Sequence, residues 1–291
     1  MTDILIIGGG PAGVSAALYA TRAGITTKII YKDIGALLKA EKVDNFYGNP
    51  GISGHELVKT GLAQAEDMGA EIIQSEVIKI EHVTSNDHFC VETTNSIYTT
   101  RALLLATGAS RAMPNIPRLA DYEGKGVSQC AVCDAFFYRG KDVAVLGSGN
   151  YAISEAMVLL PLVNSLTLLT DGNEPKICIP PEITVRNENI RQILGEARLS
   201  GVELEPDGEM LPLSGLFVAQ GVAGATELAR KIGALTDGSA TIADENMQTT
   251  IPGLWAAGDC TGGMKQIAKA VYEGAVAGLD MVRYCRDTIS N

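Results

Sequence analysis

Basic residues are scarce in this chain. Lys and Arg number 23 against 34 Asp and Glu, which gives a formal net charge of −11 over 291 residues. A nucleic-acid surface needs a cluster of basic side chains, and an anionic membrane attracts basic segments. The composition therefore predicts no nucleic-acid partner and no docking on anionic lipid.

Long hydrophobic runs are also missing. No apolar stretch approaches the roughly 20 residues that a membrane-spanning helix requires. The run Ile4–Ile7 is too short for the core of a signal peptide, and it leads directly into a glycine turn, so we expect a strand there. The sequence predicts a soluble globular protein that does not associate with membranes.

Closely spaced cysteines are limited to one pair. Of the six cysteines, only Cys130 and Cys133 lie near each other, in C-x-x-C spacing. This pattern favours a protein of the reducing cytoplasm with one redox-active couple over a disulfide scaffold. A zinc site would need a second pair of ligands, and the three histidines His55, His82 and His88 are scattered, so no metal site is expected.

Two segments share one local plan, in which an apolar strand is followed by a glycine turn, a helix and a second strand. They cover residues 3–33 and 142–171, and each is close to the roughly 30 residues of a βαβ unit. We expect an α/β fold with two Rossmann-like, three-layer dinucleotide-binding domains, the second inserted into the first. The first domain is expected over residues 1–115 and 244–291, and the inserted domain over residues 116–243.

The last part of the chain predicts a helix. Residues 263–285 carry apolar side chains at helical spacing, among them Ile267, Val271 and Ala275. We expect this helix to return to the first domain.

The first glycine turn has the full G-x-G-x-x-G spacing at Gly8, Gly10 and Gly13. In such turns the first glycine permits a tight turn, the second lets the backbone approach a pyrophosphate, and the third lets the helix pack on the strand. The helix N-terminus adds amide donors for the phosphates. The acidic residue expected as a ribose ligand is only loosely matched, by Asp33.

The second glycine turn, Gly147, Gly149 and Ala152, matches G-x-G-x-x-A. The packing of a helix against a strand would by itself account for these glycines, without a bound nucleotide. An NADPH site needs Arg or Lys after the second strand, and residues 170–175 contain neither. Asp171 could accept a hydrogen bond from an NADH ribose, or it could simply belong to the turn with Gly172. NADPH is disfavoured and NADH remains open.

The C-x-x-C pair suits thiol–disulfide exchange. Two thiols that can close a disulfide need a group that handles the proton, and Asp134 directly follows Cys133. Cys260 directly follows Gly258 and Asp259, where a cofactor is expected to bind, so a functional role for it stays open. The other single cysteines are most simply packing residues: Cys90, Cys178 and Cys285.

Seven short motifs occur in one order along nearly the whole chain: GGGPAG, VDNFYG, LLLATGA, CAVCD, GSGNYA, GLWAAGDC and KQIAKAV. Each motif alone is weak, but the ordered set resembles the low-molecular-weight thioredoxin reductases. The resemblance implies FAD in the first domain, a redox disulfide on the inserted domain, thioredoxin as the substrate and a homodimer.

The resemblance also implies roles for particular residues. Cys133 would face the flavin, Cys130 would attack the substrate disulfide, and Asp134 would be the acid/base. The residues that would bind FAD are Gly8, Gly10, Pro11, Ala12, Gly13, Gly35, Ala36, Leu37, Leu38, Asn45, Thr107, Gly108, Gly258, Asp259, Gln266 and Ile267.

The chain departs from family members that use NADPH. Those carry His-Arg-Arg and a further Arg after the second strand, where this sequence has Thr170, Asp171, Gly172 and Lys176. Such sequences resemble the branch that does not depend on pyridine nucleotides, whose members take electrons from reduced ferredoxin or, in some archaeal relatives, from a reduced deazaflavin.

The sequence therefore favours a cytoplasmic, FAD-dependent thioredoxin-disulfide reductase that is supplied by ferredoxin. The alternatives are an enzyme that uses NADH or a deazaflavin, an FAD-dependent dithiol oxidase, and a non-catalytic flavin-binding adaptor. Lys265, Lys269, Lys39 and Lys42 could attract an acidic ferredoxin, or they could form only the solvated faces of helices.

Overall fold

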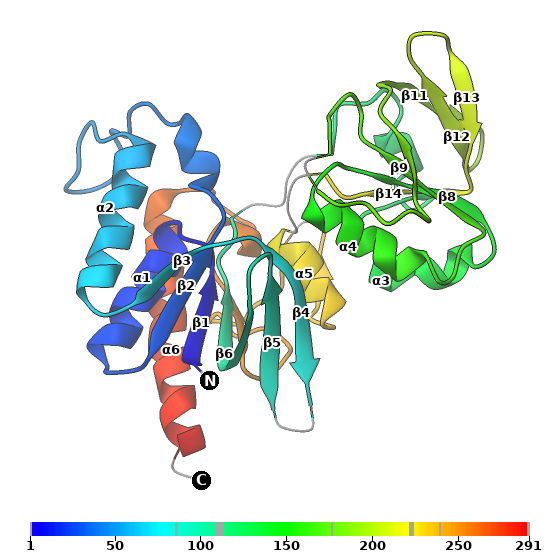
Figure 1. The fold of residues 1–291 in the computed structure, drawn as a ribbon. Coiled ribbons are helices and arrows are strands. Elements are labelled where there is room, and N and C mark those ends of the chain that lie inside the picture. Colours follow the sequence, from blue (N-terminus) through cyan, green and yellow to red (C-terminus); the bar gives the residue numbers. More distant parts are fainter. Residues whose placement is uncertain are drawn as a thin grey trace. The chain divides into compact units, whose positions relative to one another are not determined.

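The computed structural model describes residues 2–84, 87–108, 113–175, 177–220, 224–238 and 240–289. The chain divides into two compact units, one made of Met1–Ser110 with Gly224–Asn291 and the other of Arg111–Ala223 (Figure 1). Both units contain a parallel sheet with helices, so the predicted α/β fold with one Rossmann-like domain inserted into another is confirmed.

The chain re-enters the first unit at Gly224, whereas the sequence placed this boundary at residue 244. The reason is helix α5 (Ala225–Lys231), which packs against strands β4 and β16 of the first unit. The first boundary, expected after residue 115, lies after Ser110. A short helix between two loops carries little periodic signal, so only its tertiary contacts assign it to a unit.

The first unit is built on a seven-stranded sheet in the order β3-β2-β1-β6-β5-β4, with β17 also paired to β6. Strands β3, β2, β1, β6 and β17 are mutually parallel, while β4 and β5 join antiparallel. The strands are β1 Thr2–Ile7, β2 Thr27–Tyr31, β3 Glu71–Gln74, β4 Val77–Val83, β5 His88–Thr93, β6 Ile97–Leu105 and β17 Leu254–Ala256. A separate short pair is β15 Thr236–Asp237 with β16 Ala240–Thr241.

Three helices share one hydrophobic core with this sheet: α1 Pro11–Arg22, α2 Gly54–Asp67 and α6 Ile267–Ile289. Strand β1 is buried along most of its length because it lies between β2 and β6, which explains its continuous apolar run. The predicted closing helix is confirmed, and it begins at Ile267. Two 3-10 turns complete the unit, η1 Gly35–Lys39 and η4 Asp259–Thr261.

The second unit carries a five-stranded parallel sheet in the order β10-β9-β8-β14-β7. Its strands are β7 Val127–Ser128, β8 Asp142–Leu146, β9 Ser165–Leu169, β10 Thr184–Arg186 and β14 Gly215–Val218. Its helices are α3 Ala131–Asp134 and α4 Asn150–Leu159, with 3-10 turns η2 Ala120–Tyr122 and η3 Ala135–Tyr138.

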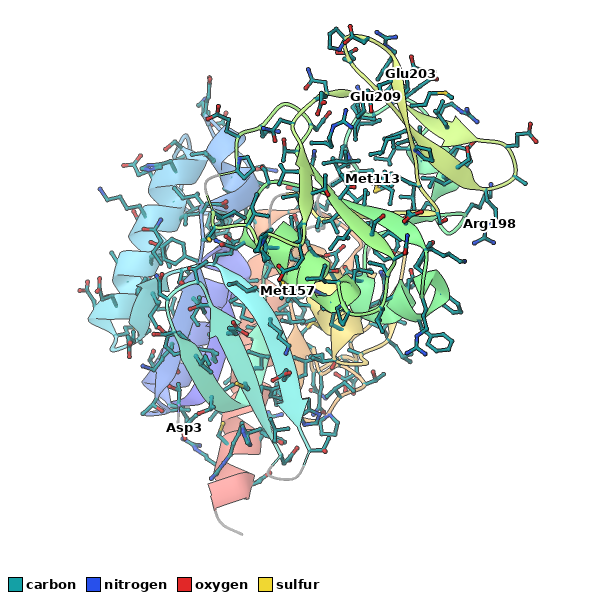
Figure 2. All side chains as sticks on the ribbon, turned by 45° about the vertical axis from the view of Figure 1, so that its right-hand side comes forward. Asp3, Met113, Met157, Arg198, Glu203 and Glu209 are labelled. Atoms are coloured by element: carbon teal, nitrogen blue, oxygen red, sulfur yellow. The ribbon has the colours of Figure 1, made fainter. Side chains whose placement is uncertain are left out.

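An antiparallel sheet of three strands is added to this unit: β11 Ile190–Gly195, β12 Leu199–Leu204 and β13 Glu209–Pro212. Glu203 and Glu209 lie on its β12–β13 hairpin (Figure 2). The sequence predicted neither this sheet nor the β4–β5 extension of the first unit.

Helices α1 and α6 approach each other closely at glycines of α6. A Cβ added to Gly274 would lie 2.1 Å from the carbonyl oxygen of Ala12, and one added to Gly278 would lie 2.6 Å from that of Ala16. The Ser15 hydroxyl also donates to the Val271 carbonyl at 2.8 Å. These contacts fix α6 against the start of α1, next to the first glycine turn.

We expect Gly274→Ala to destabilise the protein by about 1–3 kcal/mol, because the new methyl group meets backbone that cannot turn aside. The measurement is urea-induced unfolding. The control is Leu279→Ala on the same helix, where the side chain is 45% exposed and the change should stay within about 0.5 kcal/mol. Equal losses in both variants would contradict the close helix contact.

Candidate functional site

The three glycines of the first turn serve different purposes. A Cβ on Gly8, whose φ is +120°, would lie 2.1 Å from the Ala106 carbonyl oxygen. A Cβ on Gly13 would lie 1.9 Å from the carbonyl oxygen of Gly8, whereas one on Gly10 would meet nothing within 4 Å. Gly8 and Gly13 therefore allow close packing, and Gly10 leaves the space that a phosphate needs to approach the backbone.

The N-terminus of α1 has no side-chain cap. Gly10 occupies the N-cap position with extended backbone, and Pro11 and Ala12 open the helix. Helix α2 differs, because the hydroxyl of its N-cap Ser53 accepts a hydrogen bond from the Glu56 amide at 3.1 Å. The first amides of α1 are left for an acceptor from outside the helix, which suits a pyrophosphate.

The expected ribose ligand, Asp33, shapes the chain after β2. Its Oδ1 accepts a hydrogen bond from the Gly35 amide at 2.8 Å, at the entry to η1. Within η1, Leu37 packs against the hydrophobic core, while Leu38 is 62% exposed. Of this predicted flavin-lining segment, Leu37 therefore serves packing.

Two predicted flavin-lining residues far apart in the sequence lie together. The Asn45 amide nitrogen donates to Oε1 of Gln266 at 2.9 Å, and Gln266 directly precedes Ile267 at the start of α6. This bond joins the loop after η1 to the loop before α6. The structure thus brings both predicted loops to one place in the first unit.

The segment after β6 also has features of a ligand site. The Thr107 hydroxyl is buried without a hydrogen-bond partner among the residues described. Beside it, Gly108 has φ +78° and open space around its missing Cβ. A buried hydroxyl without a partner is costly, so a polar ligand group would stabilise it.

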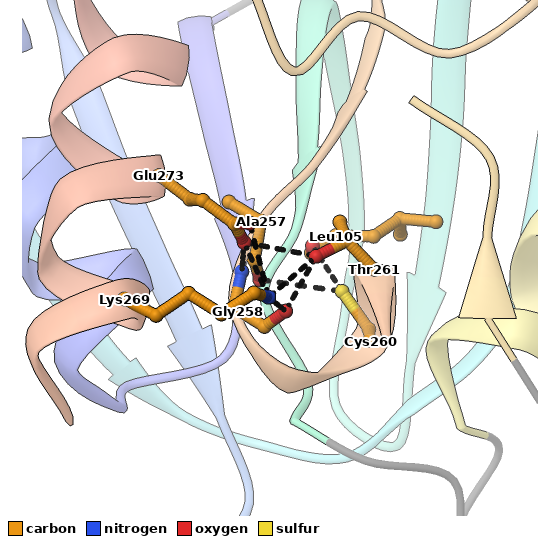
Figure 3. Close-up of polar contacts among 7 residues, drawn as sticks. All are labelled: Leu105, Ala257, Gly258, Cys260, Thr261, Lys269 and Glu273. Carbon is orange, nitrogen blue, oxygen red and sulfur yellow. Dashed lines mark hydrogen bonds and ion pairs between the residues drawn. The ribbon is translucent and has the colours of Figure 1, made fainter. Parts of the chain in front are cut away.

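The turn after β17 is held by a buried network (Figure 3). Oε2 of Glu273 accepts from the Gly258 amide at 2.8 Å and from the Thr261 hydroxyl at 2.9 Å. The Lys269 ammonium donates to the Gly258 carbonyl at 2.9 Å and pairs with Glu273 at 3.0 Å. Gly258 itself, with φ +90°, would place a Cβ 3.0 Å from the Cβ of Ala12, so this turn closes on the start of α1.

This network corrects two expectations. Lys269 was a candidate for attracting ferredoxin, but its side chain is only 15% exposed and is bound within the network. Cys260 kept a functional reading, but it is fully buried and its thiol donates to the Leu105 and Ala257 carbonyls. Burial raises the pKa of Cys260 to about 12, so it is an unreactive packing residue.

Of the other lysines in the proposed basic surface, Lys265 is exposed, and Lys42 pairs with Asp44 at 2.9 Å. The Lys39 side chain lies outside the described residues. Half-buried Asp259 has no side-chain hydrogen bond among the described contacts, and it lies at the turn that closes on α1.

In the second unit, the C-x-x-C segment forms the short helix α3. Cys130 is disulfide-bonded and 2% exposed, and it directly precedes this helix. The Ser128 hydroxyl donates to Oδ2 of Asp134 at 2.7 Å and accepts from the Cys130 amide at 3.1 Å. The predicted acid/base is thereby tied to the backbone of Cys130; the Cys133 side chain lies outside the described residues.

The second glycine turn is closely packed in its own way. A Cβ on Gly147 would lie 2.4 Å from the Ala219 carbonyl oxygen and 2.8 Å from the Cβ of Ala152. Gly149 is the N-cap of α4 and supplies no side-chain cap. The turn keeps the shape of a nucleotide-binding turn, and its first glycine has a sufficient structural reason.

Asp171 holds a turn of the second unit. It has φ +51°, and its Oδ1 accepts from the Ile190 amide at 2.9 Å. The neighbouring Asn173 side chain donates to the Thr170 and Asp171 carbonyls at 2.9 and 3.0 Å. These contacts support the turn reading of Asp171 over the reading as an NADH ribose ligand.

An arginine on the neighbouring strand β10 is also held in ion pairs. Arg186 ends β10, beside the end of β9, and its guanidinium bonds Glu188 at 2.7 Å and Glu209 at 2.6 Å. These hydrogen bonds raise the pKa of Arg186, Glu209 contributing most. Its charge is therefore balanced within the unit. Lys176 lies outside the described residues.

Among the residues that the structure describes, no group of His, Cys, Asp and Glu is arranged to hold a metal ion. Across the same residues, no helix is both long and apolar enough to cross a membrane.

Three side chains that the sequence motifs did not indicate support the two sites. They are Ser128 and Glu155 around α3, and Glu273 behind the Gly258 turn. A Glu within an otherwise apolar stretch was the available signal for Glu155, and the i,i+4 spacing of Lys269 and Glu273 was the signal for the ion pair. The sequence did not show which backbone amides these carboxylates would meet.

The residues of the first unit fit a dinucleotide, and in the second unit the disulfide-bonded Cys130 is linked through Ser128 to the Asp134 carboxylate. The family model for the pyridine nucleotide-disulphide oxidoreductases matches residues 2–274. The fold and both sites therefore place the chain in this class of two-domain oxidoreductases.

Individual relatives define the family more narrowly. The chain is 33% identical to a thioredoxin reductase of Coxiella burnetii over 97% of this chain and 96% of the relative. It is 32% identical to one of Streptomyces clavuligerus, over 97% and 93%. The chain belongs to the low-molecular-weight thioredoxin reductases, a family of flavin oxidoreductases.

Two solved structures are similar over almost the whole chain. The atypical thioredoxin reductase TRi of Desulfovibrio vulgaris Hildenborough has a TM-score of 0.88 and 38% identity, with 99% of both chains covered. A ferredoxin-flavin thioredoxin reductase of Clostridium acetobutylicum has a TM-score of 0.70 and 28% identity, with 97% of both chains covered.

The open space at Gly10 makes a direct test of the ligand site. We expect Gly10→Val to change the free energy of unfolding of the apoprotein by no more than about 1 kcal/mol, since no protein atom lies where its Cβ would be. The same variant should lose bound flavin, measured by absorbance after purification. Gly13→Ala is the contrast, because it should destabilise the apoprotein itself. Full flavin content in Gly10→Val would contradict the site.

We expect Lys269→Met to destabilise the protein by about 3–5 kcal/mol, because it leaves the Glu273 carboxylate buried without its cation. Thermal and urea unfolding measure the loss. Lys265→Met is the matched control, since Lys265 is exposed four residues earlier. If the two variants are equally stable, the buried ion pair does not hold the turn.

Proposed function

We propose that this chain binds FAD and reduces the disulfide of thioredoxin through Cys130 and Cys133, with electrons supplied by reduced ferredoxin. The observation that carries the disulfide chemistry is the oxidised Cys130 at the C-x-x-C helix, linked through Ser128 to Asp134. We extend the proposal to a homodimer, as the family resemblance implies.

The first unit would hold FAD by its described features. The uncapped start of α1 at Gly10 would receive the pyrophosphate, and the Thr107 hydroxyl would gain a partner. The Asn45–Gln266 pair and the turn at Gly258 would lie along the rest of the cofactor. When bound, FAD accepts electrons singly and passes on a pair.

The cysteines would act in sequence. Cys133 would face the flavin and Cys130 would attack the substrate disulfide, forming a mixed disulfide that the second thiol resolves. Because Cys130 is 2% exposed, a conformational change has to uncover it before a protein substrate can react. Phe136 and Phe137, which are 73% and 67% exposed, offer apolar surface next to the motif for docking that substrate.

Asp134 would move the proton of exchange. Its carboxylate accepts a hydrogen bond from the Ser128 hydroxyl at 2.7 Å, and this bond fixes the position of the carboxylate relative to the Cys130 amide. Burial raises the pKa of nearby Tyr138, and the negative charge of Asp134 raises it further as the second cause. A carboxylate held in this way can take a proton from an attacking thiol and then deliver it to a leaving thiolate.

The choice of ferredoxin as donor rests on the second glycine turn. Residues 170–175 contain no base, Asp171 is bound to the Ile190 amide, and the Arg186 charge is balanced by two carboxylates. None of these groups is available to bind the 2′-phosphate of NADPH. The similarity to a ferredoxin-flavin thioredoxin reductase supports the same proposal.

One alternative donor has an observation in its favour. The start of α4 at Gly149 is uncapped, as at a working dinucleotide turn, so NADH is the second candidate. Reduced deazaflavin, dithiol oxidation with oxygen and a non-catalytic flavin adaptor complete the alternatives that the experiment has to separate.

The test is anaerobic bleaching of the flavin absorbance. NADPH, NADH, a reduced deazaflavin and chemically reduced ferredoxin are added to separate samples, and oxidised thioredoxin follows. We expect bleaching by ferredoxin and recovery on adding thioredoxin. Rapid bleaching by NADH or by the deazaflavin would replace ferredoxin as the donor. Oxygen uptake with small dithiols and no response to thioredoxin would identify an oxidase.

Cys130→Ser should keep its flavin and lose thioredoxin reduction by at least about 1,000-fold, because the attacking thiol is gone. Cys178→Ser is the matched control, since Cys178 is an exposed free cysteine and its loss should leave the rate unchanged. Thioredoxin reduction that persists in Cys130→Ser would overturn the assignment of Cys130 as the attacking thiol.

A further inference from the structure

Helix α4 carries a carboxylate that the proposed reaction has not used. Glu155 is 1% exposed, and its helix neighbours Ala152, Ala156 and Leu159 are fully buried. Met157, two residues further along the same helix, is 48% exposed, which marks the solvent side of α4 (Figure 2). A carboxylate on the buried side is costly unless hydrogen bonds compensate for its lost hydration.

The Glu155 carboxylate is directed at the redox motif. Its Oε2 accepts a hydrogen bond from the Ala131 amide at 2.7 Å, across 24 positions of sequence. Ala131 is fully buried, begins α3 and is bonded directly to Cys130. A buried negative charge therefore lies one peptide unit from the oxidised cysteine.

We propose that Glu155 is a positioning residue that lowers the reduction potential of the Cys130 disulfide. The dithiol formed on reduction is then a stronger reductant. The inference rests on the proposed function, because it assumes that the disulfide cycles. Glu155 acts through the Ala131 amide and through its charge, and it contacts neither flavin nor substrate in the proposal.

The chemistry of the cycle gives the direction of the effect. On reduction, the S–S bond would break and the two sulfurs would take up two protons and an electron pair, which FAD would supply in the proposed function. A Cys130 thiolate would lie near the Glu155 charge, and the Ala131 amide that would otherwise stabilise it is already occupied. Both effects raise the thiol pKa and disfavour the reduced state relative to the neutral disulfide, which lowers the reduction potential.

Other ionisable groups surround the motif and have to be separated from Glu155. Asp134 lies on α3 and is bound to Ser128, and Tyr138 follows on η3. Tyr151 lies on α4, with its hydroxyl 3.5 Å from the Gln129 carbonyl. None of these is changed by a substitution at Glu155, so a difference between variants reports the charge of Glu155 itself.

The decisive variant is Glu155→Gln, which keeps the size of the side chain and an oxygen for the Ala131 amide but removes the charge. The control is Glu182→Gln, which removes one charge from an exposed site in the same unit. Glu155→Met is the second neutral variant, because an apolar residue of similar volume is often tolerated where a buried charge is removed. It carries the same prediction if Glu155→Gln does not fold.

The flavin-loaded protein is equilibrated in dithiothreitol redox buffers. The fraction of Cys130 that is present as a free thiol is then measured by alkylation and mass spectrometry. We expect the equilibrium constant to shift at least tenfold toward the reduced form in Glu155→Gln, about 30 mV for a two-electron couple. The pH dependence of alkylation should show a lower Cys130 thiol pKa. Glu182→Gln should match the unsubstituted protein in both measurements.

Three results would decide against the inference or its basis. An unchanged potential and thiol pKa in the neutral variants would overturn the role of Glu155 and leave the proposed function standing. An equal shift in Glu182→Gln would assign the effect to net charge, which also overturns it. A Cys130 that never exchanges between thiol and disulfide would refute the proposed function, and with it this inference.

Discussion

The close approach of α1 to the end of β1, which only glycine permits, is the contact on which the first unit depends. Gly13 lies where any Cβ would strike the Gly8 carbonyl oxygen at 1.9 Å. The same requirement recurs where α6 meets α1, at Gly274. Because these backbones touch, the uncapped start of α1 and the Gly258 turn meet at one place, and the open space beside Gly10 remains for a phosphate.

In both units a buried carboxylate accepts a hydrogen bond from a backbone amide of the candidate site. Glu273 accepts a hydrogen bond from the Gly258 amide at 2.8 Å in the first unit, and Glu155 accepts one from the Ala131 amide at 2.7 Å in the second. In each case a helical side chain fixes the backbone of a loop or short helix at the site. At Gly258 the charge is offset by Lys269, so the contact mainly supports structure; at Ala131 the carboxylate lies one peptide unit from the disulfide-bonded Cys130.

The two glycine turns show how one local motif can serve different ends. Both place an uncapped helix start after a buried parallel strand, at Gly10 and at Gly149. They differ in the groups around them, because Asp171 and Arg186 of the second unit are committed to partners within that unit. A glycine turn supplies phosphate contacts, whereas the groups after the second strand decide which nucleotide, if any, is held.

The sequence alone determined the two βαβ units, the closing helix, the C-x-x-C pair and the absence of Lys and Arg from residues 170–175. These signals are local, since strand and helix periodicity and glycine spacing act over a few residues. Only the tertiary structure decided where the chain re-enters the first unit and which side chains meet across long separations. Those contacts are the Asn45–Gln266 bond, the Lys269 and Glu273 network at Gly258, the Asp171 bond to Ile190 and the Glu155 bond to Ala131. Their reason is the path of the folded chain, because a buried carboxylate or amide shows in the sequence that it needs a partner but not which backbone group the fold will bring to it.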